Sequence, residues 1–265
     1  MPIERFVVVT GLPRSGTTVL AAQLDAHSEL ELFFEPYNAH KNAPPAIAES
    51  VLRFREQMAA LYGLRRRGAV RATGFKETTI SPESIAWMEA AAAAAARECP
   101  VHVVWIVRDP VHVALSLVDG ARKWWGHQDM RFDAESFTRF LQGSERSLAR
   151  LCPFFERYGG SLISYEALAE EPEALLARLM PELGLRFEAR QLHYHEVGNQ
   201  ERKVMGDLGV ARQPQPMNAE SIRLRDREAE ELRGEIEPVL ARHGQQLFGF
   251  SRAVRAARFA TQLPG

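Results

Sequence analysis

Residues 6–18 of the chain read Phe6-Val7-Val8-Val9-Thr10-Gly11-Leu12-Pro13-Arg14-Ser15-Gly16-Thr17-Thr18. The β-branched and aromatic residues before Gly11 predict a buried strand, and the apolar stretch that begins at Thr17 has the character of a helix. A glycine-bearing turn between a strand and a helix directs backbone N–H groups and the positive end of the helix dipole toward one point. The stretch therefore predicts an anion-binding loop at the start of an α/β fold.

The side chains of this loop indicate which anion it holds. The spacing from Gly11 to Gly16 is that of the phosphate loop of ATP and GTP enzymes, but Thr17 stands where those enzymes place a lysine. Arg14 supplies a cation from inside the loop instead. A sulfuryl group carries one negative charge fewer than a phosphoryl group, so this arginine, with hydroxyls and backbone donors, can suffice without a metal ion. Taken alone, the loop can also be a structural turn that caps a helix.

The rest of the chain alternates between strand and helix patterns. The continuous apolar run over residues 101–107 is typical of a parallel strand covered on both faces, and residues 161–165 form a shorter one. Helices are expected over residues 49–67, 81–96, 111–119, 134–158, 166–180 and 219–243. Residues 33–45 and 196–217 have no regular period and are predicted to be functional loops. This order predicts a P-loop-type, three-layer α/β fold with a central, mostly parallel sheet flanked by helices.

Length, charge and cysteine content restrict the function further. A chain of 265 residues can bury one sizeable core, and we expect a single domain over residues 1–265. The formal net charge is -1, so no global field attracts nucleic acid or an anionic membrane. Cys99 and Cys152 have no metal-ligand spacing. The N-terminal apolar run is too short for a signal peptide or a membrane anchor. We expect a cytoplasmic protein without a membrane span, a metal ion or a nucleic-acid partner, and the oligomeric state stays open.

The loop and the helix after it resemble those of sulfotransferases that use 3′-phosphoadenosine 5′-phosphosulfate (PAPS). The likeness includes Leu24-Asp25-Ala26-His27 and is closest to the carbohydrate and tyrosylprotein branches and their bacterial relatives. It implies that the 5′-phosphosulfate is held by Arg14, Ser15, Gly16, Thr17 and Thr18.

A second motif of that family is an arginine at the end of a strand, followed eight residues later by a serine. The segment Val107-Arg108-Asp109-Pro110 with Leu115-Ser116 is similar to it, which implies that Arg108 and Ser116 bind the 3′-phosphate. A guanidinium at the carboxyl end of a strand and a hydroxyl two turns into the next helix can converge on one phosphate. Taken alone, Arg108 and Asp109 can instead form a structural ion pair at a helix start.

The resemblance extends to two later segments. Ser164-Tyr165-Glu166-Ala167-Leu168 looks like the segment whose tyrosine contacts the adenine, although Tyr165 can equally be a core aromatic. The stretch around Arg202 is similar to a late loop that folds over the nucleotide in bacterial relatives, which implies a cofactor contact for Arg202; a solvated charged loop is the alternative. Val19 departs from the pattern, because many cytosolic members have a tryptophan there.

Sulfuryl transfer to an alcohol needs a base for the acceptor proton. The segment Phe33-Phe34-Glu35-Pro36 places a carboxylate at the rim where the crevice of a parallel sheet is expected. Its likeness to segments of carbohydrate and tyrosylprotein sulfotransferases implies that Glu35 is the general base; the alternative is a surface glutamate. His40 shares this segment and is the main rival, and the other candidate histidines are His27, His193 and His195.

The transition state also needs positive charge near the oxygen that leaves the donor. Gly74-Phe75-Lys76-Glu77-Thr78 looks like the lysine-containing segment of tyrosylprotein and bacterial sulfotransferases. This resemblance implies that Lys76 stabilises the transition state together with Arg14. The alternative is an exposed ion pair between Lys76 and Glu77.

Together these residues predict a PAPS-dependent sulfotransferase that acts in line on an acceptor hydroxyl. A carbohydrate, a natural product or another small molecule is the expected acceptor, and protein-tyrosine sulfation is an alternative. Trp124 and Trp125 either line the acceptor pocket or belong to the core. The other classes are a P-loop kinase for a small hydroxylated substrate, which the missing lysine after Gly16 disfavours, and a non-catalytic nucleotide-binding module, which Glu35 and Lys76 disfavour.

Overall fold

A parallel five-stranded sheet forms the centre of the protein. The structure is a computed structural model that describes residues 2–40, 42–64, 68–78, 80–124, 126–196 and 219–242. The sheet has the order β2-β3-β1-β4-β5, and each neighbouring pair of strands is parallel. Its strands are β1 (Arg5–Thr10), β2 (Leu30–Phe34), β3 (Ala72–Glu77), β4 (Val101–Val107) and β5 (Gly160–Ser164).

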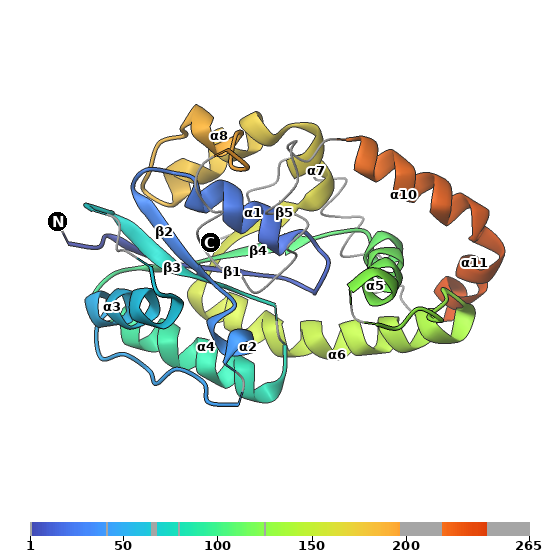
Figure 1. Ribbon diagram of the computed structural model, residues 1–265, viewed down its shortest axis with the longest axis horizontal. Coiled ribbons are helices and arrows are strands. Elements are labelled where there is room, and N and C mark those ends of the chain that lie inside the picture. Colours follow the sequence, from blue (N-terminus) through green and yellow to red (C-terminus); the bar gives the residue numbers. More distant parts are fainter. Residues whose placement is uncertain are drawn as a thin grey trace.

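Helices cover both faces of this sheet (Figure 1). On one face lie α1 (Thr17–Asp25), α7 (Tyr165–Glu170) and α8 (Pro172–Glu182). On the other face lie α3 (Val51–Tyr62), α4 (Pro82–Ala95) and α6 (Ala134–Tyr158). Side chains of β1 alternate between the two layers: Val7 and Val9 pack on the α1 side, and Phe6 and Val8 on the α4 side. The predicted three-layer α/β fold is confirmed.

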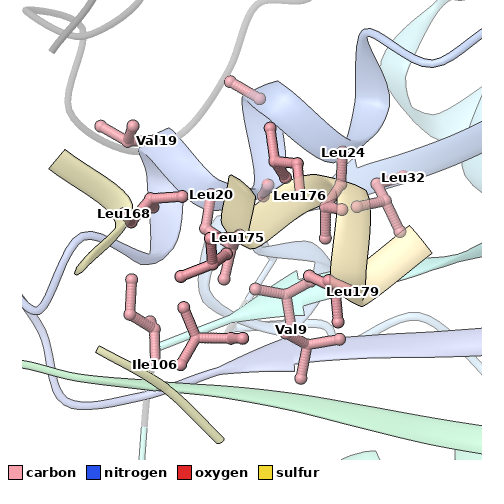
Figure 2. Close-up of a cluster of buried hydrophobic side chains, with 14 of the residues drawn as sticks. Val9, Val19, Leu20, Leu24, Leu32, Ile106, Leu168, Leu175, Leu176 and Leu179 are labelled. Carbon is pink, nitrogen blue, oxygen red and sulfur yellow. The ribbon is translucent and has the colours of Figure 1, made fainter. Parts of the chain in front are cut away.

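The core on the α1 side fixes the position of the first loop. Leu20 and Leu24 of α1 pack with Leu176 and Leu179 of α8 above Val9 of the sheet (Figure 2). All five side chains are fully buried. Full burial of one such side chain contributes about 1.5–3 kcal/mol, so α1 is held firmly on the sheet with its N-terminus at the end of β1.

The remaining helices of the described ranges lie toward the carboxyl ends of the strands. They are α2 (Pro36–Ala39), α5 (Pro110–Trp124), α10 (Glu220–Glu231) and α11 (Arg233–Arg242). A single 3-10 turn, η1 (Ala189–Gln191), follows α8. α10 contacts α5, and α11 contacts α6 (Figure 1). None of the helices in the described ranges is both long and apolar enough to cross a membrane.

The structure differs from the sequence prediction in several segments. α3 begins at Val51 and ends at Tyr62, and α5 continues to Trp124, so the bounds of both helices differ from those predicted. The loop predicted over residues 33–45 begins inside β2 and contains α2. The helix predicted over residues 166–180 is two helices that meet at Glu171, because Pro172 cannot continue the preceding helix. The helix predicted over residues 219–243 is interrupted at Leu232, close to Gly234, a residue that weakens helices.

Candidate active site

The loop between β1 and α1 contains two residues in the left-handed backbone conformation. Arg14 has a φ of 70° and Gly16 a φ of 96°. At the foot of the loop, a Cβ atom on Gly11 would lie 2.4 Å from the carbonyl oxygen of Ile106. Glycine is therefore needed at position 11 because β4 approaches its backbone, and at position 16 because of the backbone angle.

The polar groups of this loop suit an anion. Gly16 occupies the N-cap of α1 and has no side chain to cap the helix, so water or a ligand must satisfy the first N–H groups. Ser15 is 1% exposed, and its hydroxyl has no hydrogen-bond partner within the described ranges. An unsatisfied buried hydroxyl costs about 1–3 kcal/mol, which favours a polar ligand beside it. Thr17 and Thr18 form the first turn of α1.

The side chain of Arg14 connects this loop to the second predicted motif. Its Nε donates to Oγ of Ser116 over 3.1 Å, and its backbone carbonyl accepts from Nη1 of Arg108 over 3.2 Å. Arg108 directly follows β4, and Ser116 lies in α5. β1 and β4 are neighbours in the sheet, so the residues that follow them lie close together. The two residue sets that the sequence assigned to the 5′ and 3′ groups are thus in contact.

Tyr165 lies beside both sets. The Cζ atom of Arg108 is 4.0 Å from the centroid of the Tyr165 ring, which is the geometry of a cation–π contact. A Cβ atom on Gly16 would lie 2.3 Å from Cδ2 of Tyr165, so this ring packs directly on the loop. Burial lowers the pKa of Arg108, and the nearby Tyr165 and Glu166 oppose that effect in part. The guanidinium still carries its charge at neutral pH.

A second cluster surrounds Glu35, which follows β2 and precedes α2. Its backbone is left-handed, with φ 54° and ψ 51°. Its carboxylate accepts hydrogen bonds from Nζ of Lys76, from Nδ2 of Asn38 over 2.7 Å and from Oγ1 of Thr78 over 3.1 Å. Phe34 pairs with Lys76 in the sheet, and this register brings the carboxylate and the ammonium together.

The pKa of Glu35 is below its ordinary value. Burial alone would raise this pKa, but the charge of Lys76 and the hydrogen bonds from Lys76, Asn38 and Thr78 together outweigh burial. The side chains of Glu35 and Lys76 are only 7% and 1% exposed. Glu35 is therefore ionised at neutral pH.

Glu77 has a different role from the one considered in the sequence. It is fully buried, and its carboxylate accepts the backbone N–H groups of Tyr37 and Asn38, each over 3.1 Å, and of Thr78 over 2.9 Å. Neighbouring residues of a strand point to opposite faces, which separates Lys76 from Glu77. The alternative of an exposed Lys76–Glu77 ion pair is wrong, because Lys76 is buried against Glu35.

The histidines lie in different surroundings. His40 ends α2, and its ring lies edge-on to Tyr62 with 6.2 Å between the ring centroids. His27 follows α1 at the end away from the loop, and its Nε2 lies 2.7 Å from the carbonyl oxygen of Arg186. His193 and His195 follow η1. His40 thus remains the histidine that shares the Glu35 segment.

Comparison with known proteins assigns the chain to a family. The model of the Sulfotransferase family matches residues 7–189. The chain belongs to the sulfotransferase family. Sulfuryl transfer is therefore its general activity, and the match contains both clusters described above. A search of curated proteins finds no match to this sulfotransferase.

Solved structures share the fold of this sulfotransferase at low sequence identity. A sulfotransferase domain from the curacin biosynthetic pathway is 15% identical, with a TM-score of 0.53 over 86% of this chain and 99% of that domain. Mouse sulfotransferase SULT7A1, complexed with PAP, is 12% identical, with a TM-score of 0.54 over 96% of this chain and 89% of the mouse protein. The sulfotransferase domain of the Synechococcus PCC 7002 olefin synthase is 14% identical, with a TM-score of 0.50 over 86% of this chain and 95% of that domain.

Two predicted residues of this sulfotransferase fall outside the described ranges. Arg202 and Trp125 lie outside the described residues, and Trp124 is described only as the last residue of α5. In the part of the chain that the structure describes, no group of three or more His, Cys, Asp or Glu side chains could hold a metal ion.

Sequence reasoning missed the residues that support the two clusters. Asn38 and Thr78 bind the Glu35 carboxylate, and Glu77 binds the backbone of the same turn. Glu166 accepts a hydrogen bond from the backbone of Asp109. For Glu77, Thr78 and Glu166 the available signal was position, because each follows directly on a strand end or on a candidate residue; Asn38 lies three residues after Glu35, inside α2.

Proposed function

We propose that this sulfotransferase transfers the sulfuryl group of PAPS to a hydroxyl group of an acceptor, with Glu35 as the general base. The contact of Arg14 with Ser116 carries the proposal. It joins the loop at the start of α1 to the residues after β4, so that two anion-binding sets form one continuous site. Such a site suits a nucleotide that is charged at both its 5′ and 3′ positions.

The residues present fit PAPS at both ends. The buried Ser15 hydroxyl and the start of α1, formed by Gly16, Thr17 and Thr18, would hold the 5′-phosphosulfate with Arg14. The 3′-phosphate would be held by Arg108 and Ser116, and the adenine would contact Tyr165. As the family resemblance implies, Arg202 would also contact the nucleotide. When bound, PAPS supplies the sulfuryl group and a stable leaving group, PAP.

Glu35 accepts the proton of the acceptor hydroxyl, and Lys76 controls the charge of Glu35. Lys76 keeps the Glu35 carboxylate ionised before an acceptor arrives. A carboxylate with a lowered pKa is a weak base, so it takes the hydroxyl proton during the attack and not before it. Once Glu35 is neutral, the ammonium of Lys76 has lost its counter-charge and is left to stabilise negative charge that develops nearby, together with Arg14.

The acceptor that we propose is a carbohydrate, a natural product or another small hydroxylated molecule. The segment Phe34-Glu35-Pro36 favours this class, since it resembles carbohydrate sulfotransferases. We also propose that the enzyme acts in the cytoplasm, without a metal ion. Incubation of the protein with labelled PAPS, EDTA and a panel of acceptors tests the class and identifies its member. Transfer to tyrosine peptides alone would contradict it.

The general base is tested with Glu35→Gln. We expect turnover to fall at least about 100-fold while the Kd for PAP stays within about three-fold, because the carboxylate acts on the acceptor proton and not on the nucleotide. Glu49→Gln is the matched control, since Glu49 is an exposed glutamate ahead of α3. Full activity of the Glu35 variant would exclude Glu35 as the base and direct attention to His40.

The same preparation separates the rival functions. Hydrolysis of ATP that depends on Mg²⁺, without sulfuryl transfer, would indicate a kinase. Binding of PAP without transfer to any acceptor would indicate a non-catalytic module.

A further inference from the structure

Glu166 lies where two of the anion-binding segments leave the sheet. β4 and β5 are neighbouring parallel strands, and Val107 pairs with Ser164 at their carboxyl ends. The residues after them therefore emerge side by side: Arg108 and Asp109 after β4, and Tyr165 and Glu166 after β5. Glu166 is 4% exposed, and the function proposed above gives it no role.

The carboxylate of Glu166 connects these two segments. Its Oε1 accepts the backbone N–H of Asp109 over 3.0 Å, and its Oε2 accepts the hydroxyl of Ser164 over 2.8 Å. Ser164 in turn caps α7, since its Oγ accepts the backbone N–H of Ala167 over 3.3 Å. One buried side chain thus spans the gap between the end of β5 and the turn after β4.

The hydrogen bond between Glu166 and Asp109 affects the position of both residues of the proposed 3′-phosphate site. Asp109 is fixed by Glu166 through its N–H, and its own Oδ1 accepts the N–H of Val111 over 2.9 Å at the start of α5. Arg108 immediately precedes Asp109, and Ser116 lies farther along α5. The turn that Glu166 holds therefore sets where the guanidinium and the hydroxyl stand relative to each other.

We propose that Glu166 is a positioning residue that makes the site selective for nucleotides with a 3′-phosphate. The inference rests on the proposed function. The length of the Glu166 side chain (its reach) is what matters, because its two carboxylate oxygens must hydrogen-bond Asp109 and Ser164 at the same time. A guanidinium binds phosphate with strict geometry, so a small displacement of Arg108 weakens that contact strongly. Glu166 bonds Asp109 and Ser164 and reaches the loop before α1 only through Arg108 and Ser116, so binding of a 5′-phosphate depends on it less than binding of a 3′-phosphate does.

Two conservative variants separate reach from charge. Glu166→Asp keeps the charge but is one methylene shorter, so it cannot meet both partners. Glu166→Gln loses the charge but keeps the reach, since its oxygen can accept from Asp109 and its amide nitrogen can donate to Ser164. Glu170→Asp is the matched control, because Glu170 is exposed at the end of the same helix, α7.

The probes are PAP and AMP, which differ only by the 3′-phosphate. Calorimetric titration gives the Kd of each, and the ratio of the two is the selectivity. We expect Glu166→Asp to lower the selectivity of the wild type about ten-fold, the effect of one broken buried hydrogen bond. Glu166→Gln should stay within about three-fold of the wild type, and Glu170→Asp should match it. The Kd for AMP should stay within about three-fold of the wild type in all three variants, which also shows that the loop before α1 is folded.

Four results would overturn the inference. Unchanged selectivity in Glu166→Asp would show that the reach of Glu166 is unimportant, and an equal loss in Glu166→Gln would show that its charge acts instead. If Glu166→Asp does not fold, Ser164→Ala decides the matter, because it removes one of the two contacts; undiminished selectivity there contradicts the inference. A wild type that binds PAP no better than AMP overturns the proposed function itself, and this inference with it.

Discussion

At the scale of single residues, the ion pair between Lys76 and Glu35 dominates the site. Both side chains are almost fully buried, so removal of one partner leaves an uncompensated charge. We expect Lys76→Met to lower the free energy of unfolding at pH 7 by about 3–5 kcal/mol. The double variant Lys76→Met/Glu35→Gln should recover most of that loss, because no buried charge remains.

Urea denaturation measures these differences. Arg139→Met is the control, since Arg139 and its partner Glu135 form an ion pair on α6 with side chains 68% and 79% exposed. Exposed pairs contribute little, so this variant should unfold at nearly the wild-type urea concentration. Equal stability of Lys76→Met and the wild type would contradict a buried ion pair in which each charge needs its partner.

The lowered pKa of Glu35 predicts how its contribution varies with pH. A carboxyl whose pKa is lower in the folded than in the unfolded state stabilises the fold fully above its unfolded pKa, near its ordinary value of 4.5. This contribution is lost as the pH falls through the folded pKa. We expect the destabilisation caused by Glu35→Gln to be largest at neutral pH and to shrink below about pH 4.5. Free energies of unfolding at pH 7, 5 and 4 test this, and a difference that grows on acidification would show that the shift has the opposite sign.

At the scale of elements, the strongest sequence signals gave the most accurate predictions. β4 and α6 have the bounds expected from the sequence, because a continuous apolar run and a long amphipathic pattern identify them. β2 was not predicted, because the charged residue Glu31 interrupts its apolar run at the second of its five positions. That charge is buried and paired with Arg55 of α3 over 2.9 Å, a partner that no local pattern reveals.

In the candidate site, too, the sequence identifies residues but not their tertiary partners. Resemblance in sequence identified Glu35 and Lys76, but their direct contact depends on the register between β2 and β3. The roles of Asn38 and Glu77 depend on the left-handed turn at Glu35, and the sequence gives no sign of that conformation at a glutamate. Tertiary pairing therefore accounts for what the sequence could not supply.

The junction between the first loop and α7 gives a prediction at this scale. Gly16→Ala must adopt a φ of 96° and also brings a methyl group to within 2.3 Å of the Tyr165 ring. Gly63→Ala, at the end of α3, must adopt a φ of 64° but meets no atom within 4 Å. We expect Gly63→Ala to cost about 1 kcal/mol of stability and Gly16→Ala clearly more. PAP affinity should fall at least about ten-fold in the Gly16 variant alone. Equal effects of both variants on affinity would refute a direct contact between the loop and Tyr165.

At the scale of the whole molecule, every strand contributes to the proposed site through the segment at its carboxyl end. The loop around Arg14 follows β1, Glu35 follows β2, and Lys76 lies at the end of β3. Arg108 follows β4, and Tyr165 follows β5. A parallel sheet brings these ends to one edge, which is where ligands bind in open α/β folds. The site is therefore complete only when the entire sheet is formed.

This dependence predicts that the nucleotide stabilises the molecule as one unit. A ligand that binds only the folded state at 100 times its Kd adds about 2.7 kcal/mol to the free energy of unfolding, or about 5–10 °C in Tm for a chain of this length. We expect PAP to raise the Tm of one cooperative transition by this amount, with AMP at the same concentration giving a smaller rise and EDTA no change. Differential scanning calorimetry measures the transition and also tests the single domain predicted over residues 1–265. Two transitions, of which PAP moves only one, would show that part of the chain folds independently of the site.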